Sequence, residues 1–442
     1  MHSLYNLSIL LYSWFLEFAA FFHPKARAWI QGRKGWKEEL KSKLSSLHGH
    51  RIIWFHCASL GEFEQGRPLI EEIRKRYPEF KVIVSFFSPS GYTIRKNYPL
   101  AEAVVYLPAD IPSNARFWVE TVRPEMAFFI KYEYWFNFLK ELHERKIPVI
   151  FASAVFRQEQ LFFQWYGSWF RSQLEHISWF FVQNEASGEM IQSLGFENVT
   201  ISGDTRFDRV SASVASALDF PLVKKFVGNN RIIFGGSTWP EDEAMLIPLI
   251  RRITESSKTD GPIDKSAMRT PAQEAEKGQM AGDIKFILAT HDVSPARMHS
   301  LESSLGVPSI RYSDLNEDNA DSSAVLIIDT IGILSQLYQF ARIAFIGGAF
   351  GSGLHNILEA VAFGVPVFFG PKHKKFWEAS ALIDNGGAFQ VKTAEEFSEI
   401  ALRLMTGEDE YKHVSEICLD FVKQNRGGTN IILDGIKGMI TR

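Results

Sequence analysis

Residues 345–360 read FIGGAFGSGLHNILEA, and this stretch is the starting point for predicting the fold of the whole chain. The apolar run at 343–346 predicts a strand, and the residues from His355 onward predict a helix. Gly347, Gly348 and Gly353 let the backbone of the connecting turn approach a ligand closely. The N–H groups at the start of such a helix suit a phosphate. The alternative is a flexible loop followed by a capped helix.

Short apolar runs alternate with helical stretches on both sides of this segment. Most of these runs are continuously apolar, as expected for parallel strands that are covered on both faces. The pattern pauses near 211–228 and then restarts, which predicts an α/β protein with two Rossmann-like doubly wound domains facing a central cleft. The predicted strands are 52–55, 82–86, 104–107, 127–130, 149–152, 179–182 and 199–201, then 232–234, 285–289, 325–328, 343–346, 365–368 and 388–391.

Length and composition support this organisation. The chain has 442 residues, 46% hydrophobic and 22% charged, which suits two cores and excludes a disordered protein. A net charge of −3 gives no indication of a nucleic-acid partner. We predict an N-terminal helix with a basic flank at 1–45, one domain at 46–215 and a second at 216–442. Residues 255–283 have almost no bulky apolar side chains and predict a mobile insertion without a catalytic role.

Residues 4–22 are apolar apart from a few polar positions. Asn6, Ser13 and Glu17 share one side of a helix, which favours a helix lying in the membrane interface over one that spans it. Seven basic residues between 25 and 43 would face anionic headgroups and keep the next domain cytoplasmic. The alternative is a helix buried in the core of the first domain.

Three segments in the first half place polar groups at predicted strand ends. Glu62, in ASLGE at 58–62, is either a functional carboxylate or a partner of a helix dipole. The segment SPSG at 88–91 could bind a carboxylate or sugar, or simply cap a helix. Glu133, in KYEYWFN at 131–137, is either desolvated and functional or hydrogen-bonded at a helix start.

The second half carries a possible nucleotide site. Ser237 and Thr238 follow its first strand in a turn that resembles a phosphate-binding turn, although the match is weak. His291 ends the next strand, where a cap or core histidine is more common than a ligand. Glu359 shares a helix face with His355 and Asn356 and could accept the ribose hydroxyls of a nucleotide.

Together with GDTRFD at 203–208, these motifs resemble the 3-deoxy-D-manno-octulosonic acid (Kdo) transferases, a family of GT-B glycosyltransferases. The resemblance covers almost the whole chain. It implies inverting transfer of Kdo from CMP-Kdo to a lipid A precursor, lipid IVA, in lipopolysaccharide core biosynthesis. It also implies an acceptor-binding first domain and a second domain that binds the nucleotide sugar.

The resemblance assigns site residues position by position. Glu62 takes the place of the catalytic base. Trp239 stands where the family has His, and Thr290 stands where it has Arg, so another residue must contact the phosphate or carboxylate. The donor-site candidates are Ser237, Thr238, His291, Gly347, Gly348, Gly353, His355, Asn356 and Glu359. The candidates for the acceptor or its sugar are Ser59, Gly61, Ser88, Ser90, Gly91, Glu133 and Arg206.

The partners that the resemblance implies are CMP-Kdo, a lipid A precursor and the cytoplasmic face of the inner membrane, reached through residues 4–22. No metal, other cofactor or nucleic acid is expected. One alternative is another GT-B enzyme that uses a UDP-sugar, either a transferase or a UDP-N-acetylglucosamine 2-epimerase. A second alternative is a catalytically inactive GT-B binding protein. An epimerase would need neither the N-terminal helix nor its basic flank.

Overall fold

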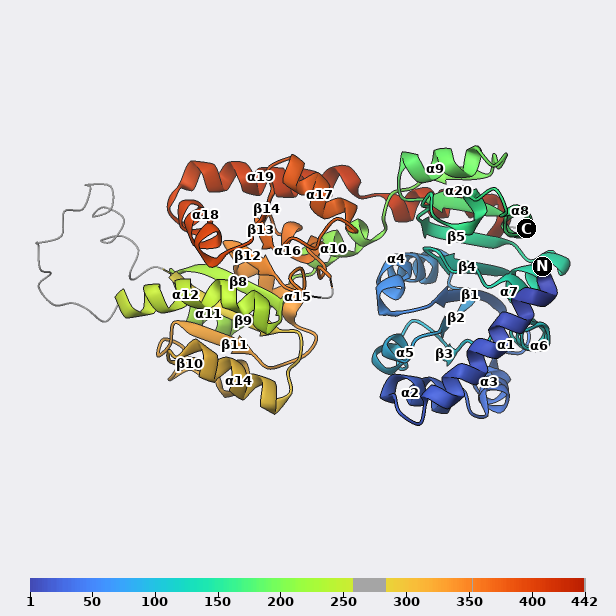
Figure 1. Ribbon diagram of the computed structural model, residues 1–442, viewed down its shortest axis with the longest axis horizontal. Helices are drawn as coiled ribbons and strands as arrows, with labels where there is room; N and C mark the ends of the chain where they lie inside the picture. Colours follow the sequence, from blue (N-terminus) through green and yellow to red (C-terminus); the bar gives the residue numbers. More distant parts are fainter. Residues whose placement is uncertain (257–283, 352, 441–442) are drawn as a thin grey trace, which may run out of the picture. The chain divides into compact units, whose positions relative to one another are not determined.

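The computed structural model describes residues 1–256, 284–351 and 353–440 and contains two compact units (Figure 1). The first unit comprises Met1–Arg209 and Asn425–Arg442, and the second comprises Val210–Gln424. Each unit holds one seven-stranded sheet. Residues 257–283, which include most of the predicted insertion, lie outside the described residues.

The sheet of the first unit is entirely parallel and has the order β3-β2-β1-β4-β5-β6-β7. The order reverses between β1 and β4, so the carboxyl ends of these two strands form the switch point where ligands bind in such sheets. The strands are β1 (Arg51–Cys57), β2 (Phe80–Phe86), β3 (Ala103–Tyr106), β4 (Met126–Ile130), β5 (Val149–Ala154), β6 (Trp179–Val182) and β7 (Val199–Ile201).

Helices cover both faces of this sheet, which explains why its strands are continuously apolar. In β1, Trp54 belongs to the core on one face, and Ile53 and Phe55 belong to the core on the other. The helices are α1 (His2–Ala19), α2 (Pro24–Gly32), α3 (Trp36–Leu44), α4 (Leu60–Arg76), α5 (Pro89–Arg95), α6 (Pro112–Val122), α7 (Phe136–Glu144), α8 (Ser168–Leu174), α9 (Glu185–Gln192) and α20 (Gly428–Ile440).

The C-terminal helix α20 belongs to the first unit, whereas the sequence placed all of 216–442 in the second domain. Ile432 and Ile436 of α20 are fully buried in the core that also contains Phe55. The backbone N–H of Thr429 donates to the Asp208 carboxylate over 2.7 Å. The prediction followed the order of the chain, which does not reveal that the last helix returns to the first sheet.

The sheet of the second unit is also parallel, with the order β10-β11-β9-β8-β12-β13-β14. Its order reverses between β8 and β12. The strands are β8 (Arg231–Thr238), β9 (Ile284–Thr290), β10 (Ser309–Arg311), β11 (Val325–Ile328), β12 (Ile343–Ile346), β13 (Val367–Phe369) and β14 (Ala388–Gln390). The sequence analysis missed β10, a three-residue edge strand that is only half-buried and therefore lacks an apolar run.

The helices of the second unit surround this sheet, and α10 links the two units along the chain. They are α10 (Arg206–Ala215), α11 (Pro221–Val227), α12 (Pro240–Ser256), α14 (Pro295–Leu305), α15 (Leu334–Leu337), α16 (Leu358–Val361), α17 (Trp377–Asp384), α18 (Ala394–Thr406) and α19 (Glu408–Asn425). The sequence therefore predicted the α/β class and the two parallel sheets correctly.

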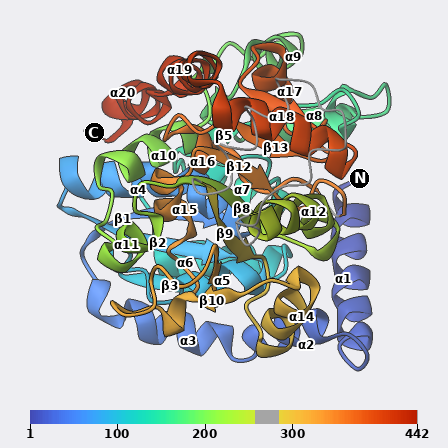
Figure 2. The same ribbon diagram turned by 90° about the vertical axis from the view of Figure 1, so that its left-hand side faces the viewer.

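Helix α1 lies on the outside of the first unit and buries no residue (Figures 1 and 2). Its inner side contacts the domain through Tyr5, Asn6 and Ser13, all half-buried. Its outer side exposes Leu4, Leu7, Leu10, Leu11, Tyr12, Trp14, Phe15 and Phe18. By length and apolar character no single described helix could cross a membrane, although α1 and α2 together pass that test as a pair bent by 118°.

The flank after α1 is less uniformly exposed than the sequence suggested. Arg33 is buried, and its guanidinium donates to the carbonyl oxygens of Trp29, Phe87 and Leu107. Burial lowers the pKa of Arg33 to about 9. Arg33 therefore joins α2 to the loops after β2 and β3 and cannot contact lipid headgroups.

Candidate active site

Two carboxylates lie at the switch point of the first sheet. Glu62 is in the first turn of α4, directly after β1, and Glu133 follows β4. Both side chains are buried, with 8% and 9% of their surface exposed. Because β1 and β4 are neighbours in the sheet, these two residues, 71 positions apart in the sequence, follow the ends of adjacent strands.

Glu62 forms a capping box with Ser59, the residue that precedes α4. Its Oε2 accepts the backbone N–H of Ser59 over 2.8 Å and also the Ser59 hydroxyl. In the described part of the chain, the other oxygen, Oε1, accepts no hydrogen bond. Glu62 therefore does lie at the helix N-terminus, where its charge complements the dipole of α4 as the sequence suggested. The cap leaves one oxygen of a fixed carboxylate for another partner.

Gly61 does not use the conformational freedom of glycine. Its φ is not positive, it lies within α4, and a Cβ there would meet only the Ser59 hydroxyl oxygen, 3.7 Å away. A tight turn therefore does not require glycine here. Because the exposed Gly61 has no side chain, it leaves the surface beside Glu62 uncovered.

Glu133 belongs to a buried polar chain that crosses three strands. The Trp54 indole N–H donates to the Ser85 hydroxyl over 2.8 Å, and Ser85 Oγ lies 2.9 Å from His56 Nδ1. His56 Nε2 lies 3.7 Å from Glu133 Oε2, which accepts the Trp135 indole N–H over 2.9 Å. Because Trp54 can only donate, the Ser85 hydroxyl hydrogen is left for Nδ1, which favours the proton of neutral His56 on Nε2, facing Glu133.

The sequence analysis missed His56, since the predicted strand stopped one residue before it. The signal was a single histidine at the end of an otherwise apolar strand. The Trp135 indole fixes the Glu133 carboxylate by a hydrogen bond, and the buried His56 ring lies close to the same oxygen without bonding to it.

The loop after β2 completes this edge. Ser88 caps α5 by accepting the backbone N–H of Ser90, and the two hydroxyl oxygens lie 2.8 Å apart, so the capping interpretation is confirmed. A Cβ at Gly91 would come within 2.4 Å of the Phe86 ring. The Ser88 backbone N–H donates to the carbonyl oxygen of Ala58, which joins this loop to the one that carries Glu62.

Arg206 is held by an ion pair within its own segment. Its guanidinium lies 2.7 Å from the buried Asp204 carboxylate, which also accepts the Gln65 amide. Burial alone would raise the pKa of Asp204, but Arg206 and these hydrogen bonds lower it. Arg206 therefore neutralises a buried acid at the start of α10, which is not what the sequence analysis expected of an acceptor ligand.

Three residues other than glycine adopt positive φ near the carboxyl ends of strands. They are Lys131 after β4, Ser153 in β5 and Ser237 in β8, with φ of 74°, 52° and 52°. Such conformations are strained and cluster at functional sites. The strain therefore marks the same edge of each sheet as the polar residues.

In the second unit the glycine-rich turn is tightly packed against β8. A Cβ at Gly347 would come within 2.3 Å of the Ser237 carbonyl oxygen, and Gly348 has a φ of +95°. The buried Asp242 carboxylate accepts the backbone N–H groups of Gly348 and Trp239 over 2.8 and 2.9 Å. Asp242, which the sequence analysis did not single out, thus holds the two loops together.

The helix after this turn is shorter than predicted. Residues 353–357 are not helical, and α16 begins only at Leu358 and has four residues. Asn356 Oδ1 accepts the Leu358 backbone N–H over 3.2 Å. The prediction that His355 and Asn356 lie in a helix whose dipole faces a phosphate is therefore wrong, because Asn356 and the turn geometry delay the helix.

His355 instead takes part in a stack of three rings. The His291 ring stacks against both Trp239 and His355, with its centroid 4.6 Å from each of theirs. The Trp239 indole N–H donates to His355 Nε2 over 3.1 Å. Burial and the neighbouring His291 lower the pKa of His355 to about 4. His355 is therefore neutral at pH 7, and with Nε2 accepting, its proton lies on Nδ1.

Ser237 and Thr238 have different environments. Ser237 is half-exposed, but Thr238 is buried and its hydroxyl donates to Glu243 over 2.9 Å. Glu243 also pairs with Arg297. The Thr238 hydroxyl is thus engaged inside the protein, so it is not exposed to a ligand in this structure.

Glu359 is half-buried beside Asn356, whose amide donates to Glu359 Oε1 over 3.1 Å. Its charge is one of the causes, after burial, that raise the pKa of the buried Tyr338. The predicted proximity of Glu359 and Asn356 is therefore present, although the two residues are not on a common helix face.

The structure adds a cation that the sequence analysis did not find. Lys372 lies in the loop after β13, and its ammonium group donates to the Gly351 carbonyl oxygen over 3.0 Å. Its backbone N–H donates to Ala349. Lys372 therefore supplies positive charge at the glycine-rich turn. The signal in the sequence was the basic run GPKHKK at 370–375.

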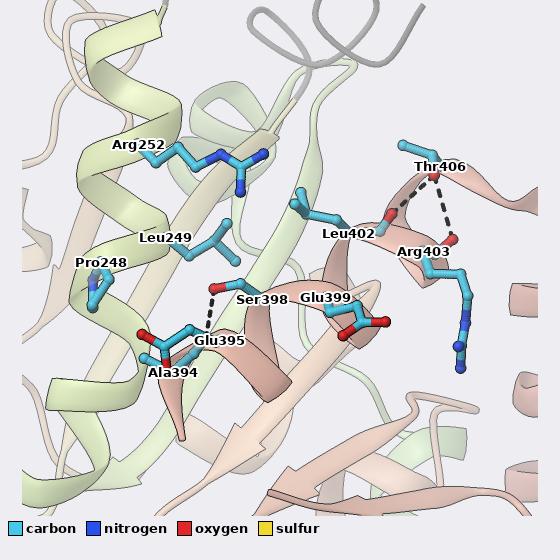
Figure 3. Close-up of a pocket in the computed structure, with 10 residues that line it drawn as sticks. All are labelled: Pro248, Leu249, Arg252, Ala394, Glu395, Ser398, Glu399, Leu402, Arg403 and Thr406. Carbon is cyan, nitrogen blue, oxygen red and sulfur yellow. Dashed lines mark hydrogen bonds between the residues drawn. The ribbon is translucent and has the colours of Figure 1, made fainter. Parts of the chain in front are cut away.

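A cavity of 630 Å³ lies elsewhere in this unit, between α12 and α18 (Figure 3). The Ser398 and Thr406 hydroxyls donate to carbonyl oxygens of their own helix. This cavity is lined by the second half of α12, which runs away from the switch point.

In residues 1–256, 284–351 and 353–440, no three His, Cys, Asp or Glu side chains are arranged to hold a metal ion.

Comparisons with known proteins agree with these features. A family model described as 3-deoxy-D-manno-octulosonic-acid transferase (kdotransferase) matches residues 31–209. The chain is 26% identical to a 3-deoxy-D-manno-octulosonic acid transferase of Rickettsia felis over 91% of this chain and 81% of that protein. It is 24% identical to the protein of that name from Haemophilus influenzae, over 88% of this chain and 87% of that one.

The fold is also found among solved structures. A UDP-GlcNAc 2-epimerase from Neisseria meningitidis, bound to UDP-GlcNAc, superposes with a TM-score of 0.58 at 17% identity, over 88% of this chain and 100% of that chain. This likeness concerns the fold alone. The two Rossmann-like units are of the GT-B class, as predicted.

Proposed function

Because the chain belongs to the Kdo transferase family, we propose that it moves Kdo from CMP-Kdo to lipid IVA, a lipid A precursor, in lipopolysaccharide biosynthesis, with inversion at the anomeric carbon. The observation that supports this most strongly is the Glu62 carboxylate. It lies at the switch point of the first sheet, and one of its oxygens is fixed by the cap while the other is available.

Glu62 is the proposed general base. Its Oε1 would accept the proton of the acceptor hydroxyl as the bond between Kdo and CMP lengthens. The capping box holds the carboxylate in one orientation, so little reorganisation is needed when the acceptor arrives. Glu133, held by the Trp135 indole, would accept a second hydroxyl of the sugar and set its direction.

The donor is proposed to bind at the switch point of the second sheet. Lys372 would face the phosphate of CMP and neutralise the negative charge that develops on it as CMP leaves. Neutral His355 would donate a hydrogen bond from Nδ1 to the same phosphate. Glu359 would accept the ribose hydroxyls. Lys372 is our candidate for the cationic contact that Thr290 cannot make.

Helix α1 is proposed to hold the enzyme on the cytoplasmic face of the inner membrane. Its exposed apolar side would enter the interface, while Tyr5 and Asn6 tie the other side to Asp110 and Asn137. Trp165, which is 90% exposed, and the half-exposed Tyr166 would add a second contact. Phe156 and Phe162, which precede these residues in the sequence, are buried in the core and cannot contribute to this contact.

Mass spectrometry of purified lipid IVA after incubation with the protein and CMP-Kdo tests this proposal. We expect the acceptor to gain the mass of Kdo, and we expect full activity in excess EDTA. No product with CMP-Kdo, or a product formed only with a UDP-sugar, would contradict the proposed function. Activity that disappears in EDTA and returns with Mg²⁺ would contradict transfer without a metal.

A further inference from the structure

A second binding site lies beneath helix α1. It is a cavity of 260 Å³ within the first unit. Helix α1 provides one wall, α2 another, and the loops after β2, β3 and β4 form the floor. The residues that line it are Ile9, Tyr12, Ser13, Trp29, Phe87, Ala109, Asp110 and Trp135.

Most polar atoms of this lining are already engaged within the protein. The Ser13 hydroxyl donates to the Ile9 carbonyl oxygen, and the Trp135 indole N–H donates to Glu133. Asp110 accepts the Tyr5 hydroxyl over 2.6 Å and two backbone N–H groups of α7. The indole N–H of Trp29 has no partner in the described part of the chain, and the half-exposed Tyr12 adds one hydroxyl, but these two groups are too few to bind a sugar or phosphate. The lining therefore favours an apolar ligand.

The position of the cavity indicates where that ligand comes from. One wall is the inner side of α1, whose outer side exposes Leu10, Trp14 and Phe18. Another part of the lining is Trp135, which is bonded to Glu133 at the switch point. A chain in this cavity would thus lie between the exposed apolar helix and the carboxylates of the proposed acceptor site.

We propose that this cavity binds a segment of one acyl chain of the lipid acceptor. The proposal rests on the function proposed above. The cavity is smaller than the roughly 300–1,000 Å³ of sites that enclose a whole drug-sized ligand, so it suits part of a single chain. The sugar headgroup binds outside it, next to Glu62 and Glu133.

Two serines of α1 allow a matched test. Ser13 lines the cavity and Ser8 is exposed on the same helix, and each hydroxyl donates to the carbonyl oxygen of its own helix. Ser13→Leu fills the cavity, whereas Ser8→Leu adds the same side chain on the outside. Ala109→Leu fills the cavity from its floor, in the loop after β3, and so controls for a defect that is specific to α1.

The readout is kcat/KM for two detergent-dispersed acceptors, lipid IVA and its fully deacylated glucosamine disaccharide, with thermal stability and CMP binding measured in parallel. Each methylene displaced from the cavity lowers affinity about fourfold, so we expect Ser13→Leu and Ala109→Leu to lower kcat/KM for lipid IVA at least about tenfold. Activity on the deacylated acceptor, and the Ser8→Leu variant, should remain at the wild-type level.

Equal losses on both acceptors, or no loss on either, would overturn the acyl-chain site. A wild-type protein that transfers Kdo to neither acceptor would instead contradict the proposed function. If one of the two cavity-filling variants unfolds, the other still tests the acyl-chain site, because Ser13 lies on α1 and Ala109 in the loop after β3.

Discussion

The exposed apolar side of α1 leads to a prediction whose size can be worked out from the structure. Phe15 and Phe18 are each 60% exposed in a helix that buries nothing. Complete burial of a Phe side chain contributes about 1.5–3 kcal/mol, so moving the exposed part into lipid contributes about 1–2 kcal/mol per residue. We expect Phe15→Ser with Phe18→Ser to weaken binding to anionic vesicles by about 2–4 kcal/mol, or roughly 30- to 1,000-fold.

Sedimentation with vesicles of inner-membrane composition measures this partition coefficient. Ile331→Ser is a suitable control because Ile331 is 82% exposed in the second unit, so it loses apolar surface away from α1. These substitutions change only the exposed side of α1, whereas deletion of the helix would also remove the hydrogen bond from the Tyr5 hydroxyl to Asp110. If the double variant binds vesicles as tightly as the Ile331→Ser variant, α1 is not the membrane contact.

Three further predictions concern the donor site and the support of α1. Glu359→Ala should weaken CMP binding by about 1–3 kcal/mol in calorimetry, because the ribose hydroxyls and the Asn356 amide lose their acceptor, and unchanged affinity would place the nucleotide elsewhere. Lys372→Gln should weaken CMP binding about fivefold, while Lys375→Gln, a matched change in the same loop, should not; equal effects would remove Lys372 from the site. Burial raises the pKa of Asp110 to about 6, above the ~4 expected for the unfolded chain. The folded protein therefore holds this proton more tightly, and the contribution of Asp110 to stability falls as pH rises from ~4 to ~6 and is constant above that. In urea unfolding, the stability difference between wild type and Asp110→Asn should change by about 3 kcal/mol across this range, and a constant difference would refute the raised pKa.

Much of the fold could be predicted because its signals are local. A strand covered on both faces is continuously apolar, so runs such as 127–130 and 343–346 identify the parallel sheets. The sequence also placed Glu62 and Glu133 at strand ends, on the carboxyl edge where such sheets bind ligands, and the structure added that the two strands are adjacent. The position of Glu62 at a helix N-terminus was also predicted, although the capping box with Ser59 was found only in the structure.

The features that the sequence did not reveal depend on tertiary contacts. Helix α20 returns to the first unit through Asp208, and the buried Arg33 binds carbonyl groups of two separate loops, at Phe87 and Leu107. The late start of α16 follows from an Asn356 cap that competes with the helix. Each of these depends on a partner that is distant in the sequence or on a local bond that competes with a regular pattern.

The central claim is that Glu62 acts as the base in Kdo transfer and also caps α4, and Glu62→Gln separates these two roles. Glutamine also closes a capping box, so the free energy of unfolding and CMP binding should stay at the wild-type level. Ser59→Ala, the control, removes the hydroxyl partner of the cap and keeps the carboxylate. The decisive measurement is the rate at which each variant transfers Kdo from CMP-Kdo to lipid IVA. We expect Glu62→Gln to lose about 10²–10⁴-fold in this rate and to remain folded, whereas a rate within about tenfold of wild type would contradict Glu62 as the base.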